Sequence, residues 1–406
     1  MADADVLIVG AGAAGAIAAL TATKRGLRTV VLERENKVGG HTKTKIDVTE
    51  GTGILPIIRS LELKTLGYSN TSHWSAPNTS LTLHSKTSDV FFKRGPDSDS
   101  LETHAVQAAK KRGAKLITGV KKLEYLLDAK GYCSRVEAWS GQKRYEIRPQ
   151  TIIIAEGDHT SSLDPLGFSW RKQEPLRIIG YGFSSRRMKL ASGSTNLFLD
   201  AELLPKGYFY AIKNKGFGFA SIVLDARQTA KKELSEYYWD FVHANPTVRE
   251  LVKTATDAAY VDGGCTAYSL DSLTKNNILA VGTAGRLFDP LFGYGVRQAI
   301  YSGYWAATAL ADAKGSKQKD WIEPGIKQYE IEMQRQLLPE IRAAWKARPL
   351  FESLTNKDLN TIIRELNSAG EGADELIERP SAHLFKIMKI LLRHPRLAWL
   401  ALKAIS

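Results

Sequence analysis

Cysteine is nearly absent from this chain, whose 406 residues include only Cys133 and Cys265. Two residues cannot form a disulfide framework, and their wide separation matches no spacing of a metal site. We therefore predict two inert, buried thiols and no bound metal. The same scarcity predicts a reducing compartment, which means a cytoplasmic protein.

Long apolar runs are absent as well. No uncharged apolar stretch reaches the ~18–20 residues that a membrane-spanning helix needs. The first residues enter a strand-like run without the basic segment and cleavage site of a signal peptide. There is also no low-complexity tract and no repeat of roughly 20–50 residues. A chain of this length without repeats predicts two or three packed lobes.

Acidic residues are outnumbered: 43 Asp and Glu face 56 Lys and Arg, which gives a formal net charge of +13. Such an excess favours anionic partners, such as a phosphorylated cofactor, an acidic lipid surface or a nucleic acid. The basic residues are dispersed and surround no motif that reads nucleic acids, so we expect no nucleic-acid partner.

The first 33 residues contain the clearest motif. Residues 5–9 and 28–33 are short apolar runs typical of buried strands, and the small residues of 13–25 between them predict a helix. A strand, a helix and a second strand in this order form a βαβ unit with a right-handed crossover. This unit predicts a Rossmann-like α/β domain.

The turn of this unit, residues 10–15, has the pattern G-x-G-x-x-G. Gly10 permits the tight turn, Gly12 lets the backbone approach a pyrophosphate, and Gly15 lets the helix pack closely on the strand. The free amide groups and the dipole of the helix start favour the phosphates. Glu33 ends the second strand, where a carboxylate can accept hydrogen bonds from ribose hydroxyls. Together these features predict a bound dinucleotide.

A second glycine-rich segment distinguishes NAD from FAD, which share the βαβ unit. Residues 281–296 follow a buried strand near 278–281 and precede a helix predicted over 296–312. Small residues there let the backbone approach a flat ligand, and a helix that begins near Val296 points its positive end at that ligand. Reduced flavin carries negative charge near N1 and O2, so this arrangement favours FAD.

These segments together resemble the FAD fingerprints of the para-hydroxybenzoate hydroxylase-type flavoproteins. Within that superfamily the chain is most similar to the archaeal geranylgeranyl reductases. The resemblance covers about residues 1–315 and is carried by residues 10–15, Glu33, 154–158, 282–285, 289–295 and 299–307. It implies FAD, reduced by NAD(P)H or a ferredoxin-like donor, and hydride delivery to a double bond of an isoprenoid chain.

The resemblance also implies the residues that contact the cofactor. Arg94 lies before a predicted helix, where related flavoproteins place an arginine near the cofactor. The full expected set is Gly10, Gly12, Ala13, Ala14, Gly15, Glu33, Arg34, Gly40, Arg94, Gly157, Gly282, Thr283, Asp289, Gly293, Tyr294, Gly295 and Val296.

An isoprenoid or prenyl-lipid substrate requires an apolar, aromatic pocket. Residues 208–212 precede a G-x-G at 216–218, which is where those reductases carry an aromatic signature. Strand alternation places Tyr208, Tyr210 and Ile212 on one face. The residues expected to contact the substrate are Tyr208, Tyr210, Ile212, Pro290 and Phe292.

The catalytic residues stay open at this stage. Saturation of an alkene needs a proton as well as a hydride. His41, Tyr208 and Tyr210 have suitable chemistry, although none of them stands out from residues with a structural role. We therefore treat these three only as candidates.

Two features keep other functions open. Residues 39–42, which follow Glu33, resemble the glycine doublet of carotenoid desaturases and amine oxidases. Desaturation or amine oxidation is therefore an alternative, and an FAD-dependent monooxygenase, in which the flavin activates oxygen, is another. Thr283 stands where the family has an acid in its second flavin motif, so a non-catalytic flavoprotein-like binding module is a third interpretation.

The order of the predicted elements indicates α/β architecture with a cofactor domain that a second, antiparallel lobe interrupts. Strand-like segments dominate residues 176–225, residues 229–257 read as helical, and residues 324–406 read as a helical C-terminal region. We predict an FAD-binding domain from 1–60, 90–160 and 265–315, a substrate domain from 61–89 and 161–264, and a C-terminal region from 316–406.

The last residues combine apolar and basic positions. Residues 383–393 predict a helix with one apolar and one basic face, and residues 394–406 continue the pattern with Trp399. A basic amphipathic helix with tryptophan suits an anionic membrane surface. We therefore expect either peripheral membrane contact through 383–406 or a final helix packed on the protein body.

Overall fold

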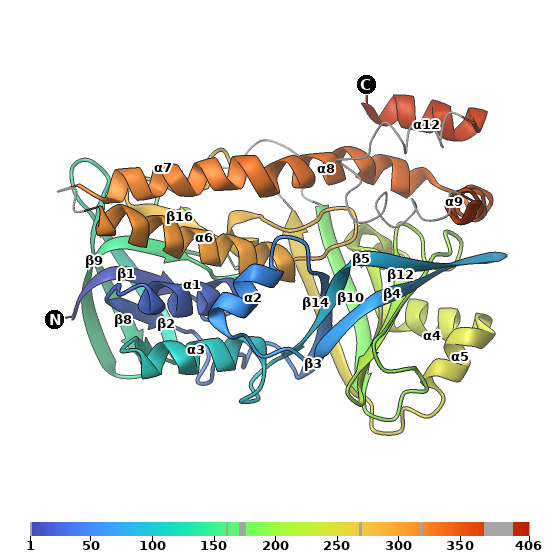
Figure 1. Cartoon of the computed structure of the whole chain (residues 1–406), viewed down its shortest axis with the longest axis horizontal. Helices are drawn as coiled ribbons and strands as arrows, with labels where there is room; N and C mark the ends of the chain where they lie inside the picture. The colour runs from blue at the N-terminus through green and yellow to red at the C-terminus, as the bar shows by residue number, and fades with distance from the viewer. Residues whose placement is uncertain are drawn as a thin grey trace.

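Two sheets lie side by side in the computed structural model, and long helices cross above both of them (Figure 1). The structure describes residues 2–159, 161–169, 176–267, 270–316, 320–368 and 393–405. The predicted fold class is confirmed: a Rossmann-like sheet is combined with a largely antiparallel sheet and a helical C-terminal region. The exact domain boundaries stay a prediction.

The first sheet contains the βαβ unit. Its strand order is β15-β16-β9-β1-β2-β6, and a hairpin of β7 and β8 continues from β9. The pairs from β16 to β6 are all parallel. The strands are β1 (Ala2–Val9), β2 (Thr29–Leu32), β6 (Lys115–Ile117), β7 (Val120–Leu127), β8 (Cys133–Ser140), β9 (Lys143–Ile154), β15 (Thr274–Lys275) and β16 (Ile278–Ala280).

Both faces of this first sheet are covered, which explains the continuous apolar run of β1. Val6 and Ile8 pack with three helices, whereas Leu7 and Val9 pack toward the β7–β8 hairpin. The helices are α1 (Ala13–Lys24), α3 (Leu101–Lys111) and α6 (Val296–Gly315). The alanine-rich α1 lies between α3 and α6, because its small side chains let both neighbours approach.

The second sheet has the order β14-β10-β13-β12-β11-β4-β5-β3. Its neighbours are antiparallel except for the parallel pair of β11 and β4. The strands are β3 (Lys45–Glu50), β4 (Gly67–Ala76), β5 (Thr79–Arg94), β10 (Leu176–Ser185), β11 (Ser194–Phe198), β12 (Tyr208–Asn214), β13 (Phe217–Asp225) and β14 (Ala259–Ala267).

Helices cover the second sheet unevenly. The helices α4 (Leu234–Ala244) and α5 (Pro246–Val252) pack on one face through an aromatic cluster that includes Phe209, Tyr238 and Phe241. The opposite face meets α9 (Asn356–Ser368) near the tip of the long β4–β5 hairpin (Figure 1).

The C-terminal helices join the two sheets. The segments α7 (Ile322–Glu332), a π-helical turn (Met333–Leu337) and α8 (Leu338–Ser353) follow one another without a gap. In Figure 1 they run along the top of both sheets. The extended backbone of Leu354 ends α8 before α9 begins. Helix α12 (Pro395–Ile405) packs on α8. A short helix α2 (Leu55–Leu61) and two 3-10 turns (Ala226–Ala230 and Gly282–Gly285) complete the elements.

One expected helix is divided. The region predicted as helical over 229–257 contains α4 and α5, which are separated at Asn245 and Pro246. Proline cannot donate the amide that would continue α4. The Asn245 side chain instead accepts a 3.1 Å hydrogen bond from the Val248 amide and begins a new helix.

We expect Gly15→Ala to destabilise the fold even without cofactor. An added Cβ would lie 1.9 Å from the Gly10 carbonyl oxygen. Such overpacking costs about 1–3 kcal/mol or more, and the better helix propensity of alanine returns only about 1 kcal/mol. Thermal unfolding of the cofactor-free protein measures the result. An unchanged or raised melting temperature contradicts the close packing assigned to this glycine.

Candidate active site

An elongated cavity of about 1220 Å³ connects the two sheets. It begins at the carboxyl ends of β1 and β2 and reaches the loop 289–296 beside β12. The expected cofactor residues that line it are Gly10, Gly12, Ala13, Ala14, Glu33, Arg34, Arg94, Gly157, Thr283, Gly293, Tyr294, Gly295 and Val296. Folding therefore brings both predicted cofactor segments to one cavity.

The glycine turn has the shape that a pyrophosphate requires. Gly10 has a φ of +97°, and a Cβ there would lie 2.4 Å from the Ala155 carbonyl oxygen. A Cβ on Gly12 would meet no protein atom within 4 Å, so this side of the turn faces the cavity. No side chain caps α1, and its first turn contains no acidic residue. The free amide groups and positive helix end therefore remain available to phosphate.

The acid at the end of β2 shapes the turn as well as the cavity. One Glu33 carboxylate oxygen accepts a 2.8 Å hydrogen bond from the Ala11 amide, and the other accepts one of 2.8 Å from the Glu35 amide. Both oxygens retain lone pairs for a further donor. Glu33 thus holds the glycine turn while it faces the position predicted for a ribose.

Four expected cofactor residues do not line the large cavity. Gly15 and Gly282 are packing residues, because a Cβ on Gly282 would lie 2.8 Å from Ala14 Cβ. Gly40 lies next to the lining residue Gly39, and Asp289 lines a second cavity instead. Their assignment as direct cofactor contacts stays a prediction.

The loop 289–296 is a closed turn that leads into α6. The Asp289 amide donates to the Tyr294 carbonyl at 2.7 Å, and the Gly293 amide donates to the Asp289 carbonyl at 2.8 Å. The Asp289 carboxyl accepts a 2.7 Å bond from the Leu291 amide, and burial raises its pKa to about 6. Gly295 precedes α6 without a side-chain cap, so the helix start faces the cavity. This geometry fits a flavin ring.

Arg94 lies at the cavity wall but is bound within the protein. Its guanidinium forms ion pairs with Asp47 at 2.9 Å and with Glu102. A guanidinium has five N–H donors, so two carboxylates do not exhaust its capacity. Cofactor contact by Arg94 stays a prediction.

The expected substrate residues separate into three groups. Tyr208 and Tyr210 line the large cavity, Phe292 lines both cavities, and Ile212 and Pro290 are buried outside both linings. The Tyr208 hydroxyl donates to the Phe292 carbonyl, and its ring centre lies 5.6 Å from that of Phe292. Tyr208 therefore anchors the loop 289–296. We call this segment the flavin loop, because it is the segment predicted to contact the flavin.

The three candidate proton donors have different surroundings. Burial raises the pKa of Tyr208 and of Tyr210 well above the usual value, which makes both hydroxyls weaker acids. His41 lines the large cavity, and its ring lies 5.7 Å from that of His159. The role of these three residues as proton donors stays a prediction.

A second cavity of about 280 Å³ adjoins the flavin end of the first. The two cavities share the wall residues Val48, Tyr210, Phe292 and Tyr294. Apolar side chains from β4, β5, β11 and α8 form much of the second lining, including Trp74, Leu83, Leu197, Ile341, Ala343, Ala344 and Ala347. The sequence did not indicate this cavity, because its walls come from segments distant along the chain.

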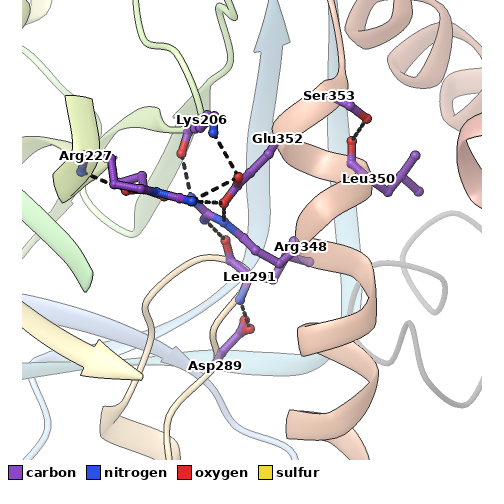
Figure 2. A network of polar contacts seen from close by, with 9 residues as sticks. Lys206, Arg227, Asp289, Leu291, Arg348, Leu350, Glu352 and Ser353 are labelled. Carbon is purple, nitrogen blue, oxygen red and sulfur yellow. Dashed lines mark hydrogen bonds and ion pairs between the residues drawn. The ribbon is translucent and has the colours of Figure 1, made fainter. Parts of the chain in front are cut away.

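The C-terminal helix α8 fixes the flavin loop through Arg348, as Figure 2 shows. This buried guanidinium donates to the Leu291 carbonyl at 2.8 Å and to the Lys206 carbonyl at 2.9 Å. Its Nε donates to Glu352 at 2.8 Å, and Glu352 also pairs with Lys206 and Arg227, both at 3.2 Å. The sequence did not indicate Arg348, because no motif marks a basic residue in a helix that is distant along the chain from the loop it contacts.

Metal ligands do not gather in the part of the chain that the structure describes: no group of three His, Cys, Asp or Glu residues there could hold an ion. Cys133 is buried and Cys265 is half-buried. Burial raises the pKa of the Cys133 thiol to about 11 and that of Cys265 to about 12. Both thiols are therefore protonated and poor nucleophiles at neutral pH.

Comparison with known proteins identifies the family of the chain. The FAD binding domain family matches residues 3–335. The digeranylgeranylglycerophospholipid reductase 1 of Methanococcoides burtonii is 25% identical over 96% of this chain and 93% of its own length. The digeranylgeranylglycerophospholipid reductase 2 of Methanopyrus kandleri is 26% identical over 89% of this chain and 90% of its own length.

Solved structures show the same fold. A geranylgeranyl bacteriochlorophyll reductase-like protein from Thermoplasma acidophilum has a TM-score of 0.78 and 20% identity, covering 97% of this chain and 99% of its own. A probable FAD-dependent monooxygenase from Pseudomonas aeruginosa has a TM-score of 0.66 and 16% identity, covering 90% and 100%. The predicted FAD cofactor and the resemblance to geranylgeranyl reductases are confirmed.

We expect Gly12→Val to remove FAD while the fold is retained. The new side chain meets no protein atom at its Cβ and occupies the space predicted for the pyrophosphate. FAD affinity should fall at least ~100-fold, which corresponds to about 2.7 kcal/mol. Flavin absorbance of the purified protein and thermal unfolding of its cofactor-free form measure the two effects. A yellow Gly12→Val protein contradicts the assigned phosphate turn.

We expect Arg348→Met to loosen the flavin loop. Each buried carbonyl left without its donor costs about 1–3 kcal/mol, and the Leu291 carbonyl belongs to that loop. Both the melting temperature and FAD affinity should decrease. The matched control is Arg342→Met on the exposed side of the same helix. Equal effects of the two substitutions on FAD affinity contradict a specific role of Arg348.

Proposed function

Because the chain belongs to the FAD binding domain family, we propose that it reduces carbon–carbon double bonds in geranylgeranyl or related prenyl chains of lipids. It is an FAD-dependent oxidoreductase of the geranylgeranyl reductase-like type. The substrate proposal rests on one structural observation, the largely apolar second cavity at the flavin end of the cofactor cavity. An apolar cavity stabilises a hydrocarbon chain by removing its surface from water.

The chain's own residues have distinct tasks in this proposal. The glycine turn and Glu33 hold the adenine end of FAD, and the loop 289–296 holds the flavin end. FAD supplies a hydride equivalent when it is bound and reduced. The wall of Tyr210, Phe292 and Tyr294 places a prenyl chain in the second cavity beside the flavin and excludes water from it.

The reductant and the membrane contact are further parts of the proposal. NAD(P)H or a ferredoxin-like donor would supply electrons to the flavin. Lipid substrates require access from a membrane, and α12 offers an exposed Trp399, whose side chain is 59% accessible. Its Leu397 packs against Leu350 and Leu354 of the body, so α12 is anchored on one side.

Membrane contact through residues 383–406 stays a prediction. Residues 383–392 of the expected amphipathic helix lie outside the described residues. Within the part of the chain that the structure describes, every helix is too short or too polar to cross a membrane. A cytoplasmic location with peripheral membrane contact stays a prediction.

The decisive experiment is anaerobic reduction of the bound flavin, followed by incubation with a panel of prenyl lipids. We expect mass spectrometry to detect products heavier by about 2 Da for each saturated bond, because saturation adds one hydride and one proton. Gly12→Val is the matched control without cofactor. Unchanged lipids across the panel contradict the reductase function, and hydroxylated products with oxygen consumption would support a monooxygenase.

A further inference from the structure

We propose that Asp89 is the catalytic acid that gives the second hydrogen, as a proton, to the double bond held in the second cavity. This inference rests on the proposed function. It names a proton donor for a step whose catalytic acid the sequence left open. Asp89 lies on β5 in the wall of the second cavity, to which α8 contributes Ile341, Ala343, Ala344 and Ala347.

The position of Asp89 follows from strand register. Asp89 pairs directly with Glu50 of β3, and Val48 of β3 pairs with Phe91 of β5. Side chains two residues apart share a face of a sheet, so both acids face the side on which Val48 forms the common wall of the two cavities. Asp89 therefore lies in the cavity that borders the flavin end.

Several other titratable groups around this cavity already form hydrogen bonds or ion pairs within the protein. Arg297 of α6 forms a bidentate ion pair with Glu340 of α8, at 2.6 and 3.1 Å, and its Nε donates to the Thr52 carbonyl at 3.1 Å. Asp289 accepts the Leu291 amide within its own turn. The groups that face the cavity are Glu50 from β3, Tyr210 from β12, Asp289 and Tyr294 from the flavin loop, Arg297 from α6 and Glu340 from α8.

Asp89 differs from these groups because it has no cationic partner within the described part of the chain. No hydrogen bond or ion pair there joins its carboxyl to another side chain. Two acids directly opposite each other repel when both are ionised. Burial, followed by the charge of Glu50, raises the pKa of Asp89 to about 7. Asp89 is therefore about half protonated at pH 7, whereas an ordinary aspartate is ionised there.

The proposed step adds one hydride and one proton across the double bond. A hydride equivalent from reduced FAD forms a C–H bond to one alkene carbon, the proton of Asp89 forms a C–H bond to the other, and the π bond breaks. FAD is oxidised and the alkene is reduced. The Asp89 carboxylate then recovers a proton from solvent, which prepares it for the next double bond.

The test compares Asp89→Asn and Asp89→Glu with the wild-type holoenzyme in the prenyl-lipid assay. General acids contribute about 100- to 10,000-fold, so Asp89→Asn should lower the saturation rate at least ~100-fold, and Asp89→Glu should restore part of it. Oxidation of the reduced enzyme by ferricyanide needs no proton at carbon and should proceed at the wild-type rate. Equal losses in both reactions would assign Asp89 to cofactor support and overturn the proposal.

The pH profile provides a readout that a structural role would not change. The acid form is the active one, so the wild-type rate should be full below the pKa of Asp89 and fall as pH rises through about 7. Glu50→Gln removes the negative neighbour, makes Asp89 easier to ionise and should move this fall to lower pH. An unchanged rate and pH profile in Asp89→Asn would overturn the proposal but leave the reductase function intact.

A direct titration separates this proposal from the proposed function. Difference infrared spectroscopy of the oxidised holoenzyme should show a protonated carboxyl band that titrates near pH 7 and is missing in Asp89→Asn. If the wild type saturates no lipid, the reductase function fails whatever the spectrum shows. If the band is absent from the wild type, Asp89 holds no proton to give, and the proposal fails whatever the lipid assay shows.

Discussion

The close approach of three backbone segments at the end of β1 is the constraint on which the site depends. Gly10 lies against the Ala155 carbonyl at the end of β9, and Gly15 of α1 lies against Gly10. A side chain at either glycine would separate the helix from the sheet. Because neither glycine has a side chain, the first turn of α1 is held at the carboxyl edge of a parallel sheet. Its free amide groups there face the space for a ligand.

The second fixed point is the flavin loop, and it is held from three directions. Tyr208 of the second sheet donates to the Phe292 carbonyl, and Arg348 of α8 donates to the Leu291 carbonyl. The loop itself leads directly into α6 of the first sheet. The C-terminal region therefore supports this loop, because the buried Arg348 guanidinium ties it to α8 and to the carbonyl of Lys206 (Figure 2).

Two cavities of different chemistry meet at this loop. The large one offers amide groups and charged side chains suited to a dinucleotide, and the small one is mostly lined by apolar side chains. The two cavities border each other at Val48, Tyr210, Phe292 and Tyr294. We propose that a flavin in the large cavity and a hydrocarbon chain in the small one meet at this border. This adjacency also places the acid pair of Glu50 and Asp89 within the proposed reaction space.

The sequence by itself determined the βαβ unit, the FAD motifs and the division into two sheet types, because these depend on local periodicity and glycine spacing. The surroundings of Arg348 and Asp89, on which their proposed roles rest, depend on tertiary structure. Arg348 acts on a loop more than 50 residues away in the chain, and Asp89 acquires its surroundings from strands, a loop and two helices. Residue type alone cannot reveal burial or the nearest charge. Packing of segments that are distant along the chain sets both.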